Sequence, residues 1–285
     1  MARPTPQWLD EQYDNRARVP EHAQIISRWQ EASALAREGS SRRLDLRYGS
    51  GPNETLDLFP TPQANAPVLV FIHGGYWRAL DKADFSFVAP VFAQAGAMVV
   101  VPNYGLCPAV SIETIALQMV KALAWTVNHA ALYGGDASRI VVAGHSAGGH
   151  LAAMMLSCDW RAVGLKKPAV KSALSLSGLY DLAPLSRASF LKDDLRLTPK
   201  SVQRLSPAGF PAPKGQLYAV VGGDESEEFQ RQNQLIQQCW GRRAVPLCEA
   251  IPGANHFTVL RELVDPASVV HRLAVSLLGL RVDAV

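Results

Sequence analysis

A serine between two glycines, in the run Gly144-His145-Ser146-Ala147-Gly148, is the residue of this chain best placed to act as a nucleophile. The β-branched run 140–142 precedes it and a helix-forming stretch, 151–156, follows it, so the sequence predicts a sharp turn from a strand into a helix. Such a turn lifts the hydroxyl above the sheet and places it at a helix N-terminus, where negative charge is favoured. The glycines are needed because a Cβ would crowd the turn. We therefore predict that Ser146 attacks an acyl carbonyl.

A serine nucleophile needs a base to take its proton and an acid to orient that base. His256 lies in a turn-rich segment, 252–257, before the last predicted helix, and is the predicted base. Asp224 follows a predicted strand in Gly-Gly-Asp-Glu-Ser and is the predicted acid, although it could also cap the next helix. Asp181, which follows the preceding strand, is the second candidate for the acid. The order serine, acid, histidine is typical of a nucleophile on such a turn.

Attack on a carbonyl builds negative charge on its oxygen, and backbone N–H groups must receive that charge. The sequence His73-Gly74-Gly75 follows another predicted strand, and successive glycines let the backbone approach a ligand closely. We predict that Gly74, Gly75 and Ala147 form the oxyanion hole and that His73 braces the loop.

Aromatic residues close to these loops are candidates for the substrate pocket. Tyr76 and Trp77 directly follow the predicted oxyanion hole, and either lining the pocket or packing the loop would suit them. Lining by these two rings would favour small acyl groups such as formyl or acetyl. Tyr180 and Phe190 could stack on an aromatic leaving group.

The elements that must position these residues alternate between strand and helix. Eight strands are predicted, at 43–48, 55–59, 68–72, 98–101, 140–143, 172–177, 216–221 and 245–250. Helices are predicted at 85–95, 112–128, 147–157, 225–240 and 258–278. Continuous apolar strands alternating with helices indicate a mostly parallel sheet covered on both faces, with the first two strands as an antiparallel pair at one edge.

Two segments stand outside this alternation. Residues 1–40 form a predicted N-terminal helical extension, with an amphipathic stretch at 7–38. Residues 180–213 hold five prolines and mixed short apolar pieces, so we expect a cap-like insertion over the carboxyl edge of the sheet. The whole chain, 1–285, is predicted to be one α/β domain.

Composition limits the partners and the compartment. The chain has 285 residues, 48% of them hydrophobic, and a net charge of +3 without a long basic run, so we expect no nucleic acid partner. Four cysteines in no metal-ligand spacing predict free thiols, no metal and no cofactor. The N-terminus has no apolar signal region and no apolar run approaches a membrane span, which predicts a cytoplasmic protein without a membrane partner. An exposed edge strand is compatible with a homodimer.

These motifs resemble the α/β-hydrolase superfamily, in its His-Gly-Gly branch of esterases, lipases and formamidases. The resemblance runs from about residue 44 to the C-terminus and is strongest to kynurenine formamidase (arylformamidase)-like proteins. Five pieces of sequence carry it, at 12–16 (Gln-Tyr-Asp-Asn-Arg), 73–77, 144–152, 177–182 and 222–226. Asn103-Tyr104 is similar to an Asp-Tyr-Arg-Leu segment of this branch, with Asn103 and Gly105 in place of the acid and the arginine.

The resemblance implies an eight-stranded α/β-hydrolase fold and a serine hydrolase that cleaves an ester or amide of a small molecule. Among the serine hydrolases of this kind, the resemblance favours an arylformamidase that acts on N-formylkynurenine. A general short-chain carboxylesterase is the alternative, and a non-catalytic small-molecule-binding protein on the same fold is the more remote one.

Overall fold

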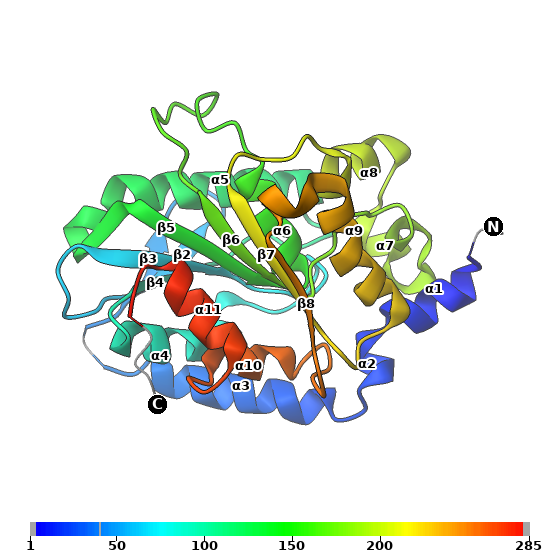
Figure 1. Cartoon of the computed structure of the whole chain (residues 1–285), viewed down its shortest axis with the longest axis horizontal. Coiled ribbons are helices and arrows are strands. Elements are labelled where there is room, and N and C mark those ends of the chain that lie inside the picture. Colours follow the sequence, from blue (N-terminus) through cyan, green and yellow to red (C-terminus); the bar gives the residue numbers. More distant parts are fainter. Residues whose placement is uncertain (1–3, 40, 282–285) are drawn as a thin grey trace.

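The computed structural model describes residues 4–39 and 41–281, and an eight-stranded sheet runs through its centre (Figure 1). The strands lie in the order β1-β2-β4-β3-β5-β6-β7-β8. The first two strands pair antiparallel at one edge, β2 pairs antiparallel with β4, and the other neighbours are parallel. The predicted sheet, with its antiparallel pair at one edge, is confirmed.

All eight predicted strands are present. Their bounds are β1 Arg43–Arg47, β2 Thr55–Phe59, β3 Ala66–Ile72, β4 Met98–Pro102, β5 Gly135–His145, β6 Ser172–Leu176, β7 Gln216–Gly222 and β8 Leu247–Ile251. The β3 and β4 strands are buried along their whole length, because helices cover both faces of the sheet. Continuous apolar runs in the sequence reflect this double burial.

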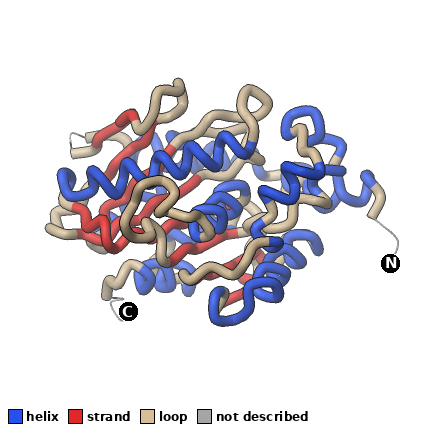
Figure 2. The backbone as a smooth tube through the Cα atoms, turned by 90° about the horizontal axis from the view of Figure 1, so that it is seen from above, coloured by secondary structure: helices blue, strands red, loops and turns tan. Residues whose placement is uncertain are grey.

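Helices form a layer on each side of the sheet (Figures 1 and 2). In chain order they are α1 Pro6–Tyr13, α2 Asn15–Arg18, α3 His22–Ala36, η1 Lys82–Val88, α4 Ala89–Gln94, α5 Ile112–His129, η2 Ala130–Tyr133, α6 Ala147–Leu156, η3 Leu185–Arg187, η4 Ser189–Leu191, α7 Lys192–Leu195, α8 Pro199–Leu205, η5 Pro207–Gly209, α9 Glu227–Ala244, α10 Val259–Val264 and α11 Val269–Leu277. The η elements are 3₁₀ helices.

The hydrophobic core is divided into two layers by the sheet. Alternate residues of β3 face opposite sides, so Val68 and Val70 pack with α5, α6 and α9, whereas Leu69 and Phe71 pack with α3, α4, α10 and α11. Both layers are built from fully buried aliphatic and aromatic side chains. This double core fixes the carboxyl ends of β3, β5, β7 and β8, where the candidate residues lie.

Three predicted helices differ in the structure. The helix predicted at 258–278 is divided into α10 and α11, because Asp265 is extended ahead of Pro266. The stretch predicted at 85–95 begins as the 3₁₀ helix η1. The extension forms three helices rather than one, with breaks at Asp14 and at Val19–Glu21, and residues 1–3 and 40 of the predicted segment lie outside the described residues.

The segment predicted as an insertion, 180–213, consists of five short helices, η3, η4, α7, α8 and η5. It lies beside α1 at the end of the molecule that carries the N-terminus (Figure 1), and the Arg78 guanidinium donates to the Phe190 carbonyl oxygen at 2.9 Å. The Ser189 N–H also donates to Asp10 of α1 at 2.6 Å, so the insertion and α1 lie together at this end of the molecule.

Within residues 4–39 and 41–281, no helix is both long enough and apolar enough to cross a bilayer.

Candidate active site

Ser146 sits at the turn between β5 and α6 with a left-handed backbone, φ 55° and ψ −117°. A Cβ on Gly144 would lie 2.2 Å from the Gly148 carbonyl oxygen, and one on Gly148 would lie 1.9 Å from the Ile72 oxygen. Only glycine therefore fits on either side of the serine. The Ser146 hydroxyl makes no hydrogen bond to a described residue and lines a cavity.

Unpaired amide groups surround this serine. Gly74 lies directly against it, since a Cβ on Gly74 would be 3.2 Å from the Ser146 Cβ. The N–H groups of Gly74, Gly75 and Ala147 have no hydrogen-bond partner among the described residues. Gly75 has φ 104°, a conformation that favours glycine. Three free donors near one hydroxyl are the arrangement that an oxyanion requires.

Side chains behind this loop hold it in place. The Tyr104 hydroxyl donates to the carbonyl oxygens of His73, at 2.9 Å, and Gly74, at 3.2 Å. The buried His73 ring stacks on Tyr104 with centroids 4.1 Å apart, and its Nε2 lies 3.1 Å from Asn103 Oδ1. Asn103 also donates to Asp81 through Nδ2, at 2.6 Å. Asn103 therefore connects the His-Gly-Gly loop to the start of η1. It does so with an amide at the position where the Asp-Tyr-Arg-Leu segment described above has an aspartate.

His256 is oriented by a buried carboxylate. Its Nδ1 lies 2.7 Å from Glu225 Oε2, so Nδ1–H donates to the carboxylate, and in the neutral imidazole Nε2 is then the nitrogen that can accept a proton. Glu225 is fully buried at its side chain, and its Oε1 accepts from the Gly222 N–H at 2.7 Å and from the Ser177 hydroxyl. Every oxygen of the acid thus has a donor, which fixes the carboxylate against the imidazole.

The structure does not bring the predicted acid, Asp224, to His256; the adjacent residue, Glu225, makes that contact instead. Asp224 is exposed, its side chain contacts neither His256 nor the cavity, and Ser226, rather than Asp224, caps α9. Asp181, the second candidate, accepts from the Ala183 N–H and pairs with Arg231 at 3.4 Å, away from His256. The chain turns after β7 so that Glu225 faces the sheet and Asp224 faces solvent. Asp224 and Glu225 are adjacent acids after the same strand, so the sequence pattern pointed equally to either residue as the partner of His256.

His145 supports the histidine from behind. Its Nε2–H donates to the His256 carbonyl oxygen at 2.7 Å, and the two rings lie 4.8 Å apart. Burial, and then the neighbouring His256, lower the pKa of His145 well below its usual value. His145 is therefore neutral and fixes the position of the His256 backbone rather than exchanging protons.

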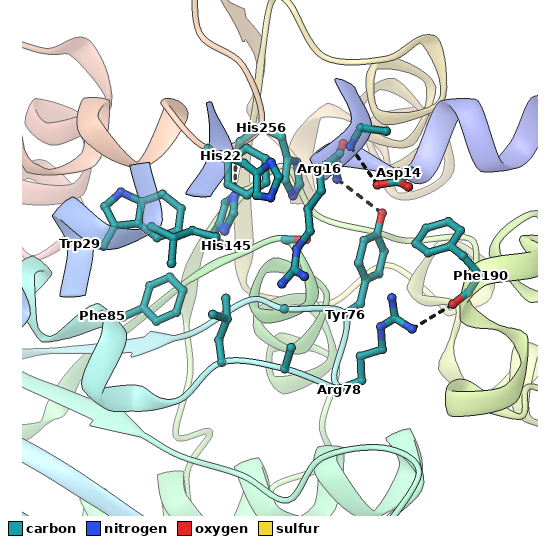
Figure 3. A pocket seen from close by; sticks show the side chains of 18 of the residues that line it. Asp14, Arg16, His22, Trp29, Tyr76, Arg78, Phe85, His145, Phe190 and His256 are labelled. Atoms are coloured by element: carbon teal, nitrogen blue, oxygen red, sulfur yellow. Dashed lines mark hydrogen bonds between the residues drawn. The ribbon is translucent and has the colours of Figure 1, made fainter. Parts of the chain in front are cut away.

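A cavity of about 740 Å³ opens beside Ser146 and His256 (Figure 3). That volume is in the range of small-molecule sites. Figure 3 shows Trp29 and Phe85 on one side of it and Tyr76 and Phe190 on the other. Aromatic faces on opposite walls can enclose a flat aromatic ring.

Two of the three residues predicted for the pocket lie elsewhere. Trp77 is fully buried and its ring packs edge-on against His150, and Tyr180 is fully buried with its hydroxyl donating to Ser175 Oγ at 2.7 Å. Neither lines the cavity, so both are packing residues. Tyr76 does line it, as does Phe190, which was named for aromatic stacking.

The N-terminal helices supply a wall of the cavity, although none of their residues was predicted from the sequence to line the substrate pocket. Seven lining residues come from this segment: Asp14, Asn15, Arg16, Ala17, His22, Ile26 and Trp29. The Tyr13 hydroxyl donates to Glu228 of α9 at 2.7 Å, and the Tyr76 hydroxyl donates to the Tyr13 carbonyl oxygen at 2.6 Å. The motif at 12–16 was a signal for this role, but nothing in its residue types placed it near the serine.

Among the residues that the structure describes, no group of three or more histidine, cysteine, aspartate or glutamate side chains could hold a metal ion.

Buried histidines make stability depend on pH. Burial lowers the pKa of His150 from 6.5 to about 4, while its Nε2–H donates to the Leu205 carbonyl oxygen at 2.8 Å. Between these values the unfolded chain binds a proton that the folded chain does not, so the free energy of unfolding falls as the pH falls from 6.5 towards 4. We expect a loss of about 2 kcal/mol from His150 at pH 5. Urea denaturation at pH 7.5 and 5.0 measures it.

The control for this prediction is His150→Gln, which removes the titrating group and keeps a side-chain N–H. The variant should lose less stability than the wild type between the two pH values. Equal losses in both proteins would show that His150 does not contribute.

Comparisons with known proteins agree with this geometry. Residues 69–221, more than half of the chain, match the family model of the alpha/beta hydrolase fold. Kynurenine formamidase from Danio rerio is 27% identical over 263 residues, which are 89% of this chain and 88% of that protein.

Solved structures give the same result. The crystal structure of a candidate thioesterase from Silicibacter sp. TM1040 superposes with a TM-score of 0.83 and 30% identity, over 95% of this chain and 98% of the other. An esterase from Pyrobaculum calidifontis shares the fold, with a TM-score of 0.72 and 19% identity over 97% of this chain and 99% of the other. The chain therefore belongs to the α/β-hydrolase family, as an enzyme related to kynurenine formamidase that hydrolyses an amide or ester bond.

Proposed function

We propose that this protein is an arylformamidase that removes the formyl group of N-formylkynurenine with a triad of Ser146, His256 and Glu225. The observation that carries the triad is the buried contact between His256 Nδ1 and Glu225 Oε2. This contact assigns the accepting role in the neutral imidazole to His256 Nε2, and both His256 and Ser146 line the cavity. Hydrogen bonds between nucleophile and base are often long before substrate binds and shorten afterwards.

The reaction follows from these positions. Ser146 Oγ attacks the formyl carbon while its proton moves to His256 Nε2, and Glu225 stabilises the imidazolium. The carbonyl oxygen becomes negative and accepts from the amides of the Gly74–Gly75 loop and of Ala147. The C–N bond then breaks as His256 gives its proton to the leaving amine. Water repeats the attack on the formyl-serine, which releases formate and restores the serine.

The aryl specificity is supported by the cavity and by the relatives. Four aromatic side chains, Trp29, Phe85, Tyr76 and Phe190, flank the space in front of Ser146 and suit an aromatic leaving group. Kynurenine formamidases of fish align with this chain over nine-tenths of its length. A short-chain carboxylesterase would use the same triad and is the second candidate, favoured by the solved structures that are named as esterases.

A direct comparison of two substrates tests this function. We expect kcat/KM for N-formyl-L-kynurenine to exceed that for p-nitrophenyl acetate, because its aryl amine leaving group carries a side chain and fills more of the cavity than p-nitrophenolate does. The release of kynurenine, followed by its absorbance, is the measurement, with Ser146→Ala as the blank. Turnover of the ester without release of kynurenine would refute the formamidase and leave an esterase.

A further inference from the structure

Four side chains with formal charge line the cavity, and three of them are already engaged. The Arg78 guanidinium pairs with Asp194 and donates to the Phe190 carbonyl oxygen. Asp14 accepts from the Ala17 N–H at 3.0 Å and so caps α2. Arg16 has no ion pair and no hydrogen bond to any described residue. One cation of the cavity, Arg16, is therefore without a partner within residues 4–39 and 41–281.

This arginine is directed at the site. In Figure 3 the Arg16 side chain runs from α2 into the cavity. In this view its guanidinium lies between the side chains of His145 and Tyr76. Its backbone is held by the preceding residues, because Asn15 Nδ2 donates to the Tyr76 hydroxyl at 3.4 Å and Tyr76 in turn donates to Tyr13. The helix that carries Arg16 is thus fixed to the loop that follows the oxyanion amides.

A guanidinium that is free in a cavity has a defined chemical complement. Its planar N–H groups match the two oxygens of a carboxylate, and the resulting charge-assisted hydrogen bonds are among the stronger ones in proteins. A formyl or acetyl group carries no charge, so the anion must belong to the leaving group. Among the described residues, neither of the two carboxylates that line the cavity, Asp194 and Asp14, forms an ion pair with Arg16.

We infer that Arg16 binds a carboxylate on the leaving group and so selects aryl amides that carry an amino acid or other carboxylic acid. This inference rests on the proposed function, because it concerns the substrate of the same site. It makes Arg16 a specificity-determining residue, which acts on binding of the leaving group and not on the reacting atoms.

The test compares N-formyl-L-kynurenine with N-formylkynuramine, which lacks the carboxylate. In the wild type, kcat/KM should be about 10- to 100-fold higher for the carboxylate substrate, mainly through KM. Arg16→Gln should reduce this ratio to about 1, and Arg16→Lys should restore part of it because the charge is retained. Arg18→Gln is the matched control, since Arg18 lies on the same helix but does not line the cavity. It should keep the wild-type ratio.

A second measurement separates the inference from the proposed function. L-kynurenine and kynuramine are compared as competitive inhibitors of p-nitrophenyl acetate hydrolysis, which requires no formamidase activity. Tighter inhibition by L-kynurenine in the wild type, lost in Arg16→Gln, would support the inference even if N-formylkynurenine were not cleaved. An unchanged substrate ratio in Arg16→Gln, or equal inhibition by both amines in the wild type, would overturn it.

Discussion

Replacing Ser146 with alanine should lower kcat/KM for every substrate by at least about 10³-fold, since the attacking hydroxyl is lost. The fold should be retained, because alanine keeps the Cβ that the turn already accommodates and the Ser146 N–H still donates to the Leu176 carbonyl oxygen. Steady-state kinetics on p-nitrophenyl acetate, with thermal melting of the same preparation, give both results. A melting temperature within a few degrees of the wild type would show that the loss is chemical.

Ser157→Ala is the matched control for this change. Ser157 lies at the other end of α6, and its hydroxyl donates only to the Ala153 carbonyl oxygen. Its activity should stay near that of the wild type. Substantial hydrolysis by pure Ser146→Ala protein would mean that another group attacks the substrate. That result would refute the proposed triad.

The second large effect distinguishes two adjacent acids. Glu225→Gln should reduce kcat by about 10³- to 10⁴-fold, because an amide does not stabilise the imidazolium or hold the correct tautomer. Asp224→Asn should change kcat less than twofold, since that side chain is exposed and has no contact with His256. The measurement is kcat for both variants on the same ester substrate.

The pair of variants decides the identity of the acid in one experiment. Each change removes one negative charge from neighbouring positions, so a general electrostatic effect would act on both. A large loss in Asp224→Asn with an active Glu225→Gln would contradict the geometry at His256. Circular dichroism of both proteins would check that the buried glutamine is tolerated.

Much of the fold could be predicted because burial on both faces leaves a strong pattern. Residues 68–72 and 98–101 are continuous apolar runs in the sequence, and in the structure both strands are buried throughout. The glycines around Ser146 were equally informative, since each lies where a Cβ would meet a main-chain oxygen. Features that depend on backbone conformation or on burial of a strand on both faces can therefore be predicted from a single sequence.

Features that depend on tertiary contacts could not be read in this way. The choice between Asp224 and Glu225 depends on the direction of one turn, which the Gly222 N–H and Ser177 fix through Glu225 Oε1. Trp77 and Tyr180 are aromatic residues near the site in sequence, but the chain directs both rings into the core. Side-chain direction in a loop is set by neighbours that come from distant parts of the chain.

The N-terminal wall of the cavity has a consequence for how such enzymes diversify. The residues of α1 to α3 that face the cavity end before β1 begins, whereas Ser146, Glu225 and His256 follow later strands. The residue proposed to bind the carboxylate of the leaving group, Arg16, and the residues proposed to break the bond are therefore encoded in separate stretches of the gene. Recombination at the junction near residues 37–42 could exchange substrate preference between relatives and leave the reaction chemistry intact.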